Sequence, residues 1–193
     1  MAEKKALIIT APNAELAGNG PGLDKLLKKA ALFTSYTAGD AISGAVEESA
    51  ITRLQAAETE TAVEKGVALG LIDLGTADAA ALDAALVAVL EGADRKTVIA
   101  VAAKNGLALY GAGINGKAGK LERPASAKDI VPTLAYIADF AITGDCTGAI
   151  LYQALKSPNL KLEEISKLKE ALVRMEGALA RDNREPWDKH DCA

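Results

Sequence analysis

Several polar residues with catalytic or metal-binding potential lie next to apolar segments of this sequence. Asp73 ends the run "GVALGLID", Asp78 follows it, and "GDAISGA" contains Asp40 and Ser43. Carboxylate oxygens are the ligands that Mg²⁺ prefers, and a serine beside a base can act as a nucleophile. Asp73 and Asp78, with Asp40, are therefore candidate ligands of one divalent metal, and Ser43 is the candidate catalytic residue.

The same residues also have common structural uses. A threonine, aspartate or serine directly before a helix caps it by accepting hydrogen bonds from its first free amides, which suits Thr76 or Asp78 for one helix and Ser43 for another. Asp40 lies in a Gly-Asp turn, where aspartate bonds the nearby backbone. Both interpretations stay open for each of these side chains.

A second group of polar residues follows the β-branched run 97–103, which ends in Lys104-Asn105-Gly106. The carboxyl end of a strand in an open α/β sheet is a common place for ligands. Lys104 and Asn105 are therefore candidate contacts to an anion.

The glycine-rich segment "GAGINGKA" (111–118) matches the phosphate-binding pattern G-x-x-x-x-G-K through Lys117. Ala118 stands where the pattern has the Ser or Thr that reaches magnesium, and no helix is predicted directly afterwards. Lys117 is therefore a third candidate anion contact, and a flexible connection is the alternative to a phosphate loop.

Histidine and cysteine, the usual zinc ligands, are scarce. His190 is the single histidine, and Cys146 and Cys192 are the two cysteines. A structural zinc site normally takes four such ligands. The tail "DKHDC" (188–192) could bind a soft metal, but an irregular C-terminal segment is the alternative. We expect no cofactor, with one divalent metal on carboxylates as the alternative.

Composition favours an acidic, cytoplasmic α/β protein. The 193 residues are 50% hydrophobic but only 4% aromatic, and the net charge is −4 without a block of Lys or Arg. Electrostatic binding to nucleic acid or an anionic membrane is therefore not expected. No signal-peptide pattern or bilayer-length apolar run is present, and two cysteines are too few for a disulfide framework.

Hydrophobic periodicity places the candidate residues on alternating strands and helices. Strands are predicted at 5–10, 33–39, 66–73 and 97–103, with 107–110 as a continuation or hairpin partner. Helices are predicted at 21–33, 77–92 and 126–139, with a short one in 145–155 and helix-compatible sequence over 43–64. Ser126 and Asp129 approximate a capping box, and Pro132 predicts a local distortion.

This order predicts an α/β domain over residues 1–158, with a mostly parallel sheet and helices on both faces. A long helix within 159–182 and a tail, 183–193, follow it. Residues 161–181 carry an apolar stripe that packs on its own domain or on a second subunit, so a protein partner or homo-oligomer is possible through this helix. The stripe consists of Leu162, Ile165, Leu168, Leu172, Met175 and Leu179.

Two segments resemble the alkaline phosphatase superfamily, which includes sulfatases, phosphodiesterases and cofactor-independent phosphoglycerate mutases. "GPGLDKLLKKAALFTSYTAG" is similar to the family's "TPNLDKLAKEGVLFTN", and "SAKDIVPTLAYIADFAITGDCTGAIL" resembles its "S-x-x-D-I-A-P-T-L" helix with the following "D-x-x-G-x-x-L". The resemblance covers most of residues 5–155. It implies an alkaline phosphatase-like core with a nucleophile near Ser43 or, second, Thr37.

The family's hydrolysis uses two metal ions that bind the attacking and leaving oxygens. Asp73 matches a family ligand, but Thr10 and Lys104-Asn105-Gly106 stand where the family has an aspartate and Asp-His-Gly. We therefore expect a non-catalytic relative that acts by binding or regulating a partner. Two alternatives remain: a phosphoryl-transfer hydrolase using Ser43 and a carboxylate metal site at Asp73, or an anion- or nucleotide-binding module using Lys117.

Overall fold

The computed structural model describes residues 4–17, 20–58, 67–157 and 160–182. The chain divides into two compact units, residues 1–156 and 157–193. The first unit is an α/β fold built on a seven-stranded sheet, and the second contains the helix α5 (Leu160–Asp182). Within the described residues, no helix is both long enough and apolar enough to span a membrane.

The central sheet has the strand order β4-β5-β1-β6-β7-β2-β8. Four neighbouring strands, β4, β5, β1 and β6, run parallel, whereas β7 is antiparallel to both of its neighbours. The sheet is therefore mixed and mostly parallel. The strands are β1 (Lys5–Ala11), β2 (Ala31–Phe33), β4 (Ile51–Arg53), β5 (Leu69–Asp73), β6 (Thr97–Ala103), β7 (Gly106–Gly111) and β8 (Gly119–Leu121).

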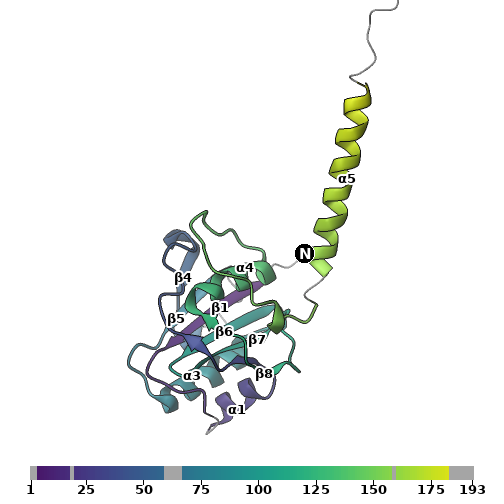
Figure 1. Ribbon diagram of the computed structural model, residues 1–193. Coiled ribbons are helices and arrows are strands. Elements are labelled where there is room, and N and C mark those ends of the chain that lie inside the picture. The colour runs from purple at the N-terminus through teal and green to yellow at the C-terminus, as the bar shows by residue number, and fades with distance from the viewer. Residues whose placement is uncertain (1–3, 18–19, 59–66, 158–159, 183–193) are drawn as a thin grey trace, which may run out of the picture. The chain divides into compact units, whose positions relative to one another are not determined.

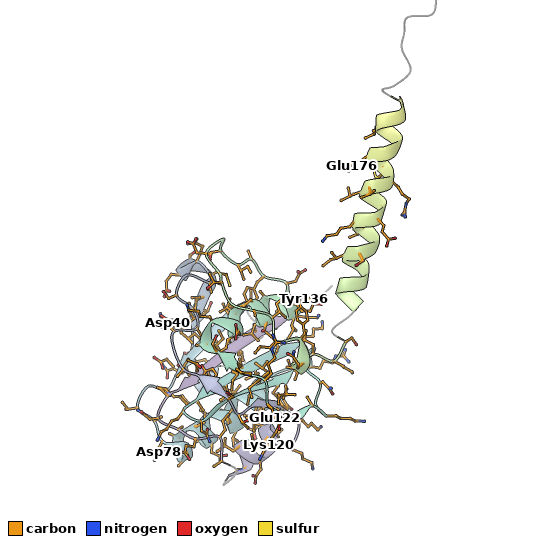
Figure 2. All side chains as sticks on the ribbon, viewed as in Figure 1. Asp40, Asp78, Lys120, Glu122, Tyr136 and Glu176 are labelled. Carbon is orange, nitrogen blue, oxygen red and sulfur yellow. The ribbon has the colours of Figure 1, made fainter. Side chains whose placement is uncertain are left out.

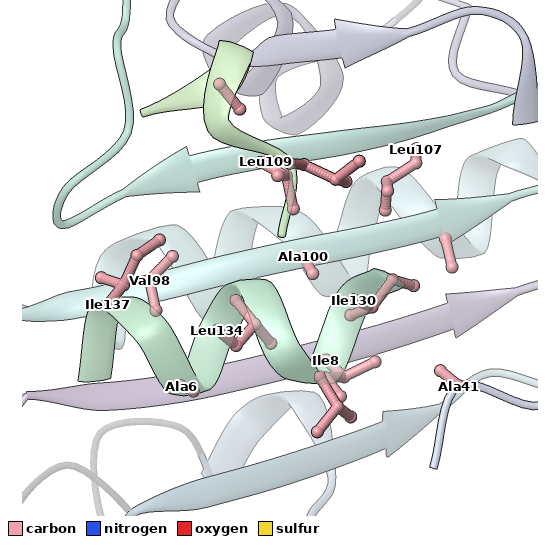
Figure 3. Packing of buried hydrophobic residues seen from close by; sticks show 14 of the residues in the cluster. Ala6, Ile8, Ala41, Val98, Ala100, Leu107, Leu109, Ile130, Leu134 and Ile137 are labelled. Atoms are coloured by element: carbon pink, nitrogen blue, oxygen red, sulfur yellow. The ribbon is translucent and has the colours of Figure 1, made fainter. Parts of the chain in front are cut away.

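Helices cover both faces of the sheet, as the alternation of the sequence predicts. The helices α1 (Pro21–Leu27) and α3 (Ala79–Gly92) pack on one face, and α4 (Ile130–Ala138) packs on the other (Figure 1). Alternate residues of β1 serve the two cores: Leu7 and Ile9 face α1 and α3, while Ala6 and Ile8 face α4 (Figure 3). All seven residues of β6 are buried, because neither of its faces meets water.

The start of α4 follows the predicted capping box, with one difference. The Asp129 carboxylate accepts hydrogen bonds from the Ser126 backbone N–H (2.8 Å) and hydroxyl (3.1 Å). Residues 127–129 form a 3₁₀ turn, so α4 begins only at Ile130. Pro132 thus lies in the first helical turn, where a missing N–H removes no helical hydrogen bond.

Four predicted segments are corrected. The helix expected at 21–33 ends at Leu27, and its last three residues form β2. Residues 43–58 contain no α-helix but the short strand β4 and two 3₁₀ turns, Glu48–Ala50 and Ala56–Glu58, while 59–66 lie outside the described residues. The segment 145–155 contains only a 3₁₀ turn, Tyr152–Ala154. The strand expected at 33–39 is divided, because β2 ends at Phe33 and β3 (Tyr36–Thr37) pairs with β9 (Ala125–Ser126) in a separate two-stranded sheet.

Candidate functional site

A cleft of about 650 Å³ lies at the edge of the sheet where β1, β4, β5 and β6 end. Parallel pairing places Thr10 of β1 beside Asp73 of β5 and Ala102 of β6. Four strand ends therefore meet at this edge, as expected for ligand sites in α/β sheets. The polar side chains that line the cleft are Thr10, Tyr36, Asp40, Ser43, Glu48, Arg53 and Asp73.

Asp73 is held in the cleft by two hydrogen bonds to one of its oxygens. Its Oδ1 accepts from the Thr10 hydroxyl (2.7 Å) and from the Gly75 backbone N–H (3.1 Å). The Thr10 bond first, then the Gly75 amide and the charge of Arg53, hold the pKa of Asp73 below its usual 3.8 against the opposing effect of burial. Its Oδ2 accepts no hydrogen bond from the described residues, so it is open to a ligand.

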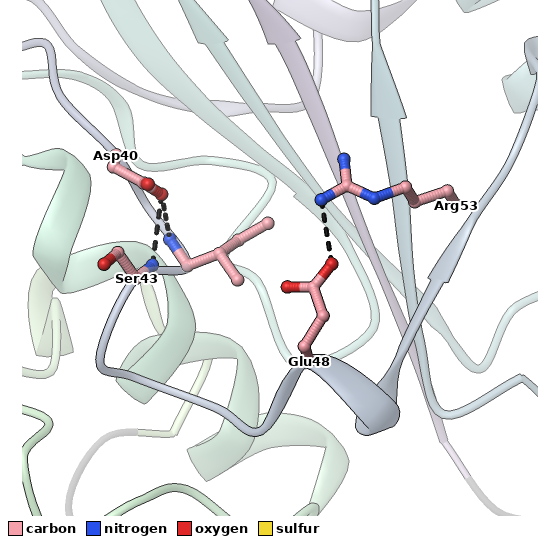
Figure 4. A network of polar contacts seen from close by, with 5 residues as sticks. Asp40, Ser43, Glu48 and Arg53 are labelled. Carbon is pink, nitrogen blue, oxygen red and sulfur yellow. Dashed lines mark hydrogen bonds and ion pairs between the residues drawn. The ribbon is translucent and has the colours of Figure 1, made fainter.

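Asp40 shapes the loop that carries Ser43. The Asp40 Oδ1 accepts hydrogen bonds from the backbone N–H groups of Ile42 (2.8 Å) and Ser43 (3.1 Å), as Figure 4 shows. These bonds, with a smaller contribution from Arg53, lower the pKa of Asp40 despite burial. This is the turn use of Asp40 that the sequence left open beside a metal-binding one.

Ser43 lines the cleft, but among the described residues no base is hydrogen-bonded to its hydroxyl. The structure forms a turn rather than a helix after Ser43, so the expected helix cap at this residue is wrong. Its hydroxyl points away from the Glu48–Arg53 pair in Figure 4 and has no hydrogen-bond partner among the described residues. A serine nucleophile needs a base within about 2.6–3.2 Å to take its proton.

Three lining residues, Tyr36, Glu48 and Arg53, were not singled out by the sequence. The Arg53 guanidinium lies 2.9 Å from the Glu48 Oε1, with 64% and 71% of these side chains exposed. Burial raises the pKa of Tyr36 to about 12, so its hydroxyl is a neutral donor at physiological pH. The consecutive β-branched residues of β4, Ile51 and Thr52, were the available signal for a strand that delivers Arg53.

Asp78 is placed away from the cleft and has a structural role. Its Oδ1 accepts a hydrogen bond from the Ala81 N–H (2.9 Å), which caps α3. Figure 2 shows Asp40 and Asp78 well apart. In the described part of the chain, no three His, Cys, Asp or Glu side chains are grouped so that they could hold a metal ion. His190 and Cys192 lie outside that part.

Lys104 and Asn105 form the two-residue turn between β6 and β7. The Asn105 Oδ1 accepts from the Leu16 N–H (2.7 Å), and the Lys104 N–H donates to the Ala14 carbonyl (2.9 Å). The Lys104 Nζ lies 3.9 Å from a Glu15 carboxylate oxygen. This turn is therefore hydrogen-bonded to the segment that follows β1. Neither Lys104 nor Asn105 lines the cleft.

The glycine-rich segment 111–118 lies at the opposite edge of the sheet. Gly111 pairs with Val98 at the start of β6, so the length of this seven-residue strand, about 20 Å, separates Lys117 from Lys104. Strand β8, not a helix, follows, and five backbone N–H groups of the segment already donate hydrogen bonds within the chain. The Ala112, Ile114 and Asn115 N–H groups donate to the carbonyls of Thr97, Gly111 and Ala154, in that order. The Lys117 N–H donates to the Asn115 side chain, and the Ala118 N–H donates to the Asn115 carbonyl. The segment therefore lacks the following helix that a phosphate loop requires, and the anion contact at Lys117 stays a prediction.

Comparison of the chain with protein-family models, curated proteins and solved structures gave no match. The likeness to the alkaline phosphatase superfamily therefore depends on the quoted motifs alone, and the cleft is interpreted from its own residues.

Proposed function

We propose that this protein is a non-catalytic binding protein, shaped like the core of the alkaline phosphatase superfamily. Its cleft takes a ligand that presents a cationic group or several hydrogen-bond donors, and this binding serves the regulation of a partner. One observation carries the proposal: the ionised carboxylates of Asp40 and Asp73 face a large cleft in which Ser43 has no base among the described residues.

The charge of the cleft favours this class of ligand. Its described lining holds three carboxylates, those of Asp40, Glu48 and Asp73, against the single guanidinium of Arg53. Arg53 is already paired with Glu48, so little positive charge is available to a phosphate group. An ammonium group gains favourable Coulomb energy from the excess of carboxylates, whereas a phosphate is repelled by it.

The hydrogen bonds at Asp40 and Asp73 support binding in a second way. In both carboxylates one oxygen is fixed by neighbouring groups of the chain, while the other accepts no hydrogen bond from the described residues. Acceptors that are already oriented bind a donor with less loss of side-chain entropy. The cleft thus offers two preorganised acceptors.

A phosphoryl-transfer hydrolase is the second candidate, favoured by the presence of Ser43 and Asp73 in one cleft. It requires a proton acceptor for Ser43 and metal ligands around Asp73. Asp78, the expected second ligand, is engaged at the start of α3. Metal bound in the purified protein and lost on Asp73→Ala would favour the hydrolase over the binding protein.

The binding proposal is tested by thermal unfolding with a panel of amines and polyols, and with orthophosphate as the anionic counterpart. A ligand present at 100 times its Kd stabilises the native state by about 2.7 kcal/mol, so the shift in Tm is readily measured. We expect a shift with an amine or polyol and none with orthophosphate. Asp73→Asn, which keeps an acceptor for Thr10 but removes the charge, should abolish the shift.

The matched control is Asp94→Asn. Asp94 precedes β6 at the opposite edge, bonds the nearby Lys96 amide and the Thr97 hydroxyl, and does not line the cleft. This variant should retain the full shift. Stabilisation by orthophosphate alone, or an amine shift that Asp73→Asn leaves unchanged, would contradict the proposed ligand class.

A further inference from the structure

Helix α5 exposes a regular apolar stripe. Ile165, Leu168, Leu172, Met175 and Leu179 follow one another at intervals of three and four residues. The exposed fractions of these five residues range from 45% to 65%. Alternating intervals of three and four make the 3.5-residue repeat of a coiled-coil seam, with the residues at the a and d positions of successive heptads. Burying such a stripe against another helix is strongly favoured in water.

The charged residues of α5 fall into two groups, one away from the apolar stripe and one directly beside it. Glu170 and Arg174 lie off the stripe and form an ion pair with each other at 4.0 Å. Lys169 and Glu176 each directly follow a seam residue, Leu168 or Met175, and so occupy the same flanking position, one heptad apart. Figure 2 shows Glu176 on this helix.

We propose that the α5 stripe binds the α5 stripe of a second copy of this chain in an antiparallel pair. Identical flanking positions face each other in antiparallel helix pairs. When Leu172 lies opposite Met175 of the second copy, Leu168 lies opposite Leu179. This register places Lys169 opposite Glu176 twice, once on each side of the twofold axis. In a parallel pair Lys169 faces Glu164 instead, while Glu176 faces Ala171 and has no cation opposite it, so only the antiparallel pair uses the charge of Glu176.

This complementarity selects a second copy as the occupant. Both the apolar and the charged pattern are self-complementary under a twofold rotation, which is the requirement for an isologous dimer. Opposite charges beside the seam determine partner choice and orientation in such helix pairs. The inference is independent of the ligand of the cleft, since it uses residues of the second unit alone.

The test is the mass of the full-length protein by sedimentation equilibrium over a wide concentration range. We expect a reversible equilibrium between one chain and twice that mass. Leu172→Asp should leave only the monomer. Val173→Asp is the matched control, since Val173 is 67% exposed but lies off the seam, and this variant should still dimerise. Circular dichroism establishes that both variants remain folded.

Orientation is tested by exchanging charges. Lys169→Glu places like charges opposite each other and should weaken the dimer about tenfold, while Lys169→Glu with Glu176→Lys should restore it. A protein that stays monomeric at every concentration overturns the proposal. This includes a monomer in which the stripe packs on its own chain or binds only lipid vesicles. A dimer that Leu172→Asp leaves intact, or one that the double exchange does not restore, also overturns it.

Discussion

Aspartate side chains at strand ends have two uses in this protein, and hydrogen-bond partners distinguish them. The Asp78 carboxylate accepts a hydrogen bond from the first turn of α3. Asp40 and Asp73 accept hydrogen bonds from backbone N–H groups of the loops that contain them, and both still line the cleft. The sequence places all three beside apolar segments, so residue type alone does not separate a cap from a site. Asn105 is a similar case, since its amide binds the Leu16 backbone.

The Thr10–Asp73 bond predicts a specific pH dependence of stability. The pKa of Asp73 is lowered in the folded protein, first by the Thr10 hydroxyl, so its contribution is complete above the unfolded value of 3.8. This contribution is lost as pH falls through the lower, folded pKa. Thr10→Val should therefore reduce stability at neutral pH by about 0.5–1 kcal/mol, a range that allows for solvent screening at this exposed site.

Urea unfolding of the wild type and the variant at pH 7 and in steps below pH 4 measures this effect. The difference between the two proteins should shrink as the medium becomes more acidic. Thr10→Ser keeps the donor hydroxyl and should follow the wild type. A Thr10→Val deficit that stays constant down to the lowest pH would show that packing, not the hydrogen bond to Asp73, causes it.

The start of α4 is hydrogen-bonded to a segment that lies 18 to 20 residues further along the chain. The buried Thr133 hydroxyl donates to the Asp129 carbonyl (2.6 Å) and accepts from the Leu151 N–H (3.0 Å). The second Asp129 carboxylate oxygen accepts from the Ala149 N–H (2.7 Å). These bonds hold residues 149–151, which lack regular structure, against the start of α4.

Thr133→Val tests this connection. The substitution keeps the shape of the side chain but leaves the buried Leu151 N–H without its acceptor, and we expect a loss of about 1–3 kcal/mol in the free energy of unfolding. Thr133→Ser retains the acceptor and should lose less. Chemical denaturation of both variants makes the comparison. A Thr133→Val variant as stable as the wild type, with the loss confined to Thr133→Ser, would attribute the role of Thr133 to its methyl group.

Long periodic elements of this fold were predictable, and short ones were not. The buried strands β1, β5 and β6, the hairpin partner β7, and helices α3 and α4 follow from apolar runs and caps. Strand β4 has only three residues in an Ala-rich, polar segment, so local pattern favoured a helix there. The pairing of β4 with β5 is a contact between distant parts of the sequence, and the hydrophobic periodicity of a short segment cannot predict it.

The same limit applies to the site. The position of Asp73 at the carboxyl edge follows from its place at the end of a predicted strand, because a parallel sheet fixes where its strands end. Arg53 and Tyr36 were missed since they come from β4 and β3, strands of only three and two residues. Lys117 was wrongly grouped with Lys104, because the reversal of direction at the β6–β7 turn sends the glycine-rich segment to the opposite edge.

The two compact units of the protein contain two different candidate binding surfaces. The first unit, residues 1–156, contains the acidic cleft, and the second contains the exposed stripe of α5. A regulatory protein that recognises a ligand in one unit and a second copy of itself through the other is consistent with both. Loss of dimerisation should therefore leave the amine-induced shift in Tm in place.

The proposal that the cleft is non-catalytic is best tested by an assay of phosphate ester hydrolysis. The purified full-length protein is given a phosphate monoester and a phosphate diester, with zinc, manganese or magnesium added in turn. The wild type and Ser43→Ala should both show only the rate of the protein-free control, because no base within the described residues is hydrogen-bonded to the Ser43 hydroxyl. Metal-dependent turnover by the wild type that Ser43→Ala loses would contradict a non-catalytic cleft.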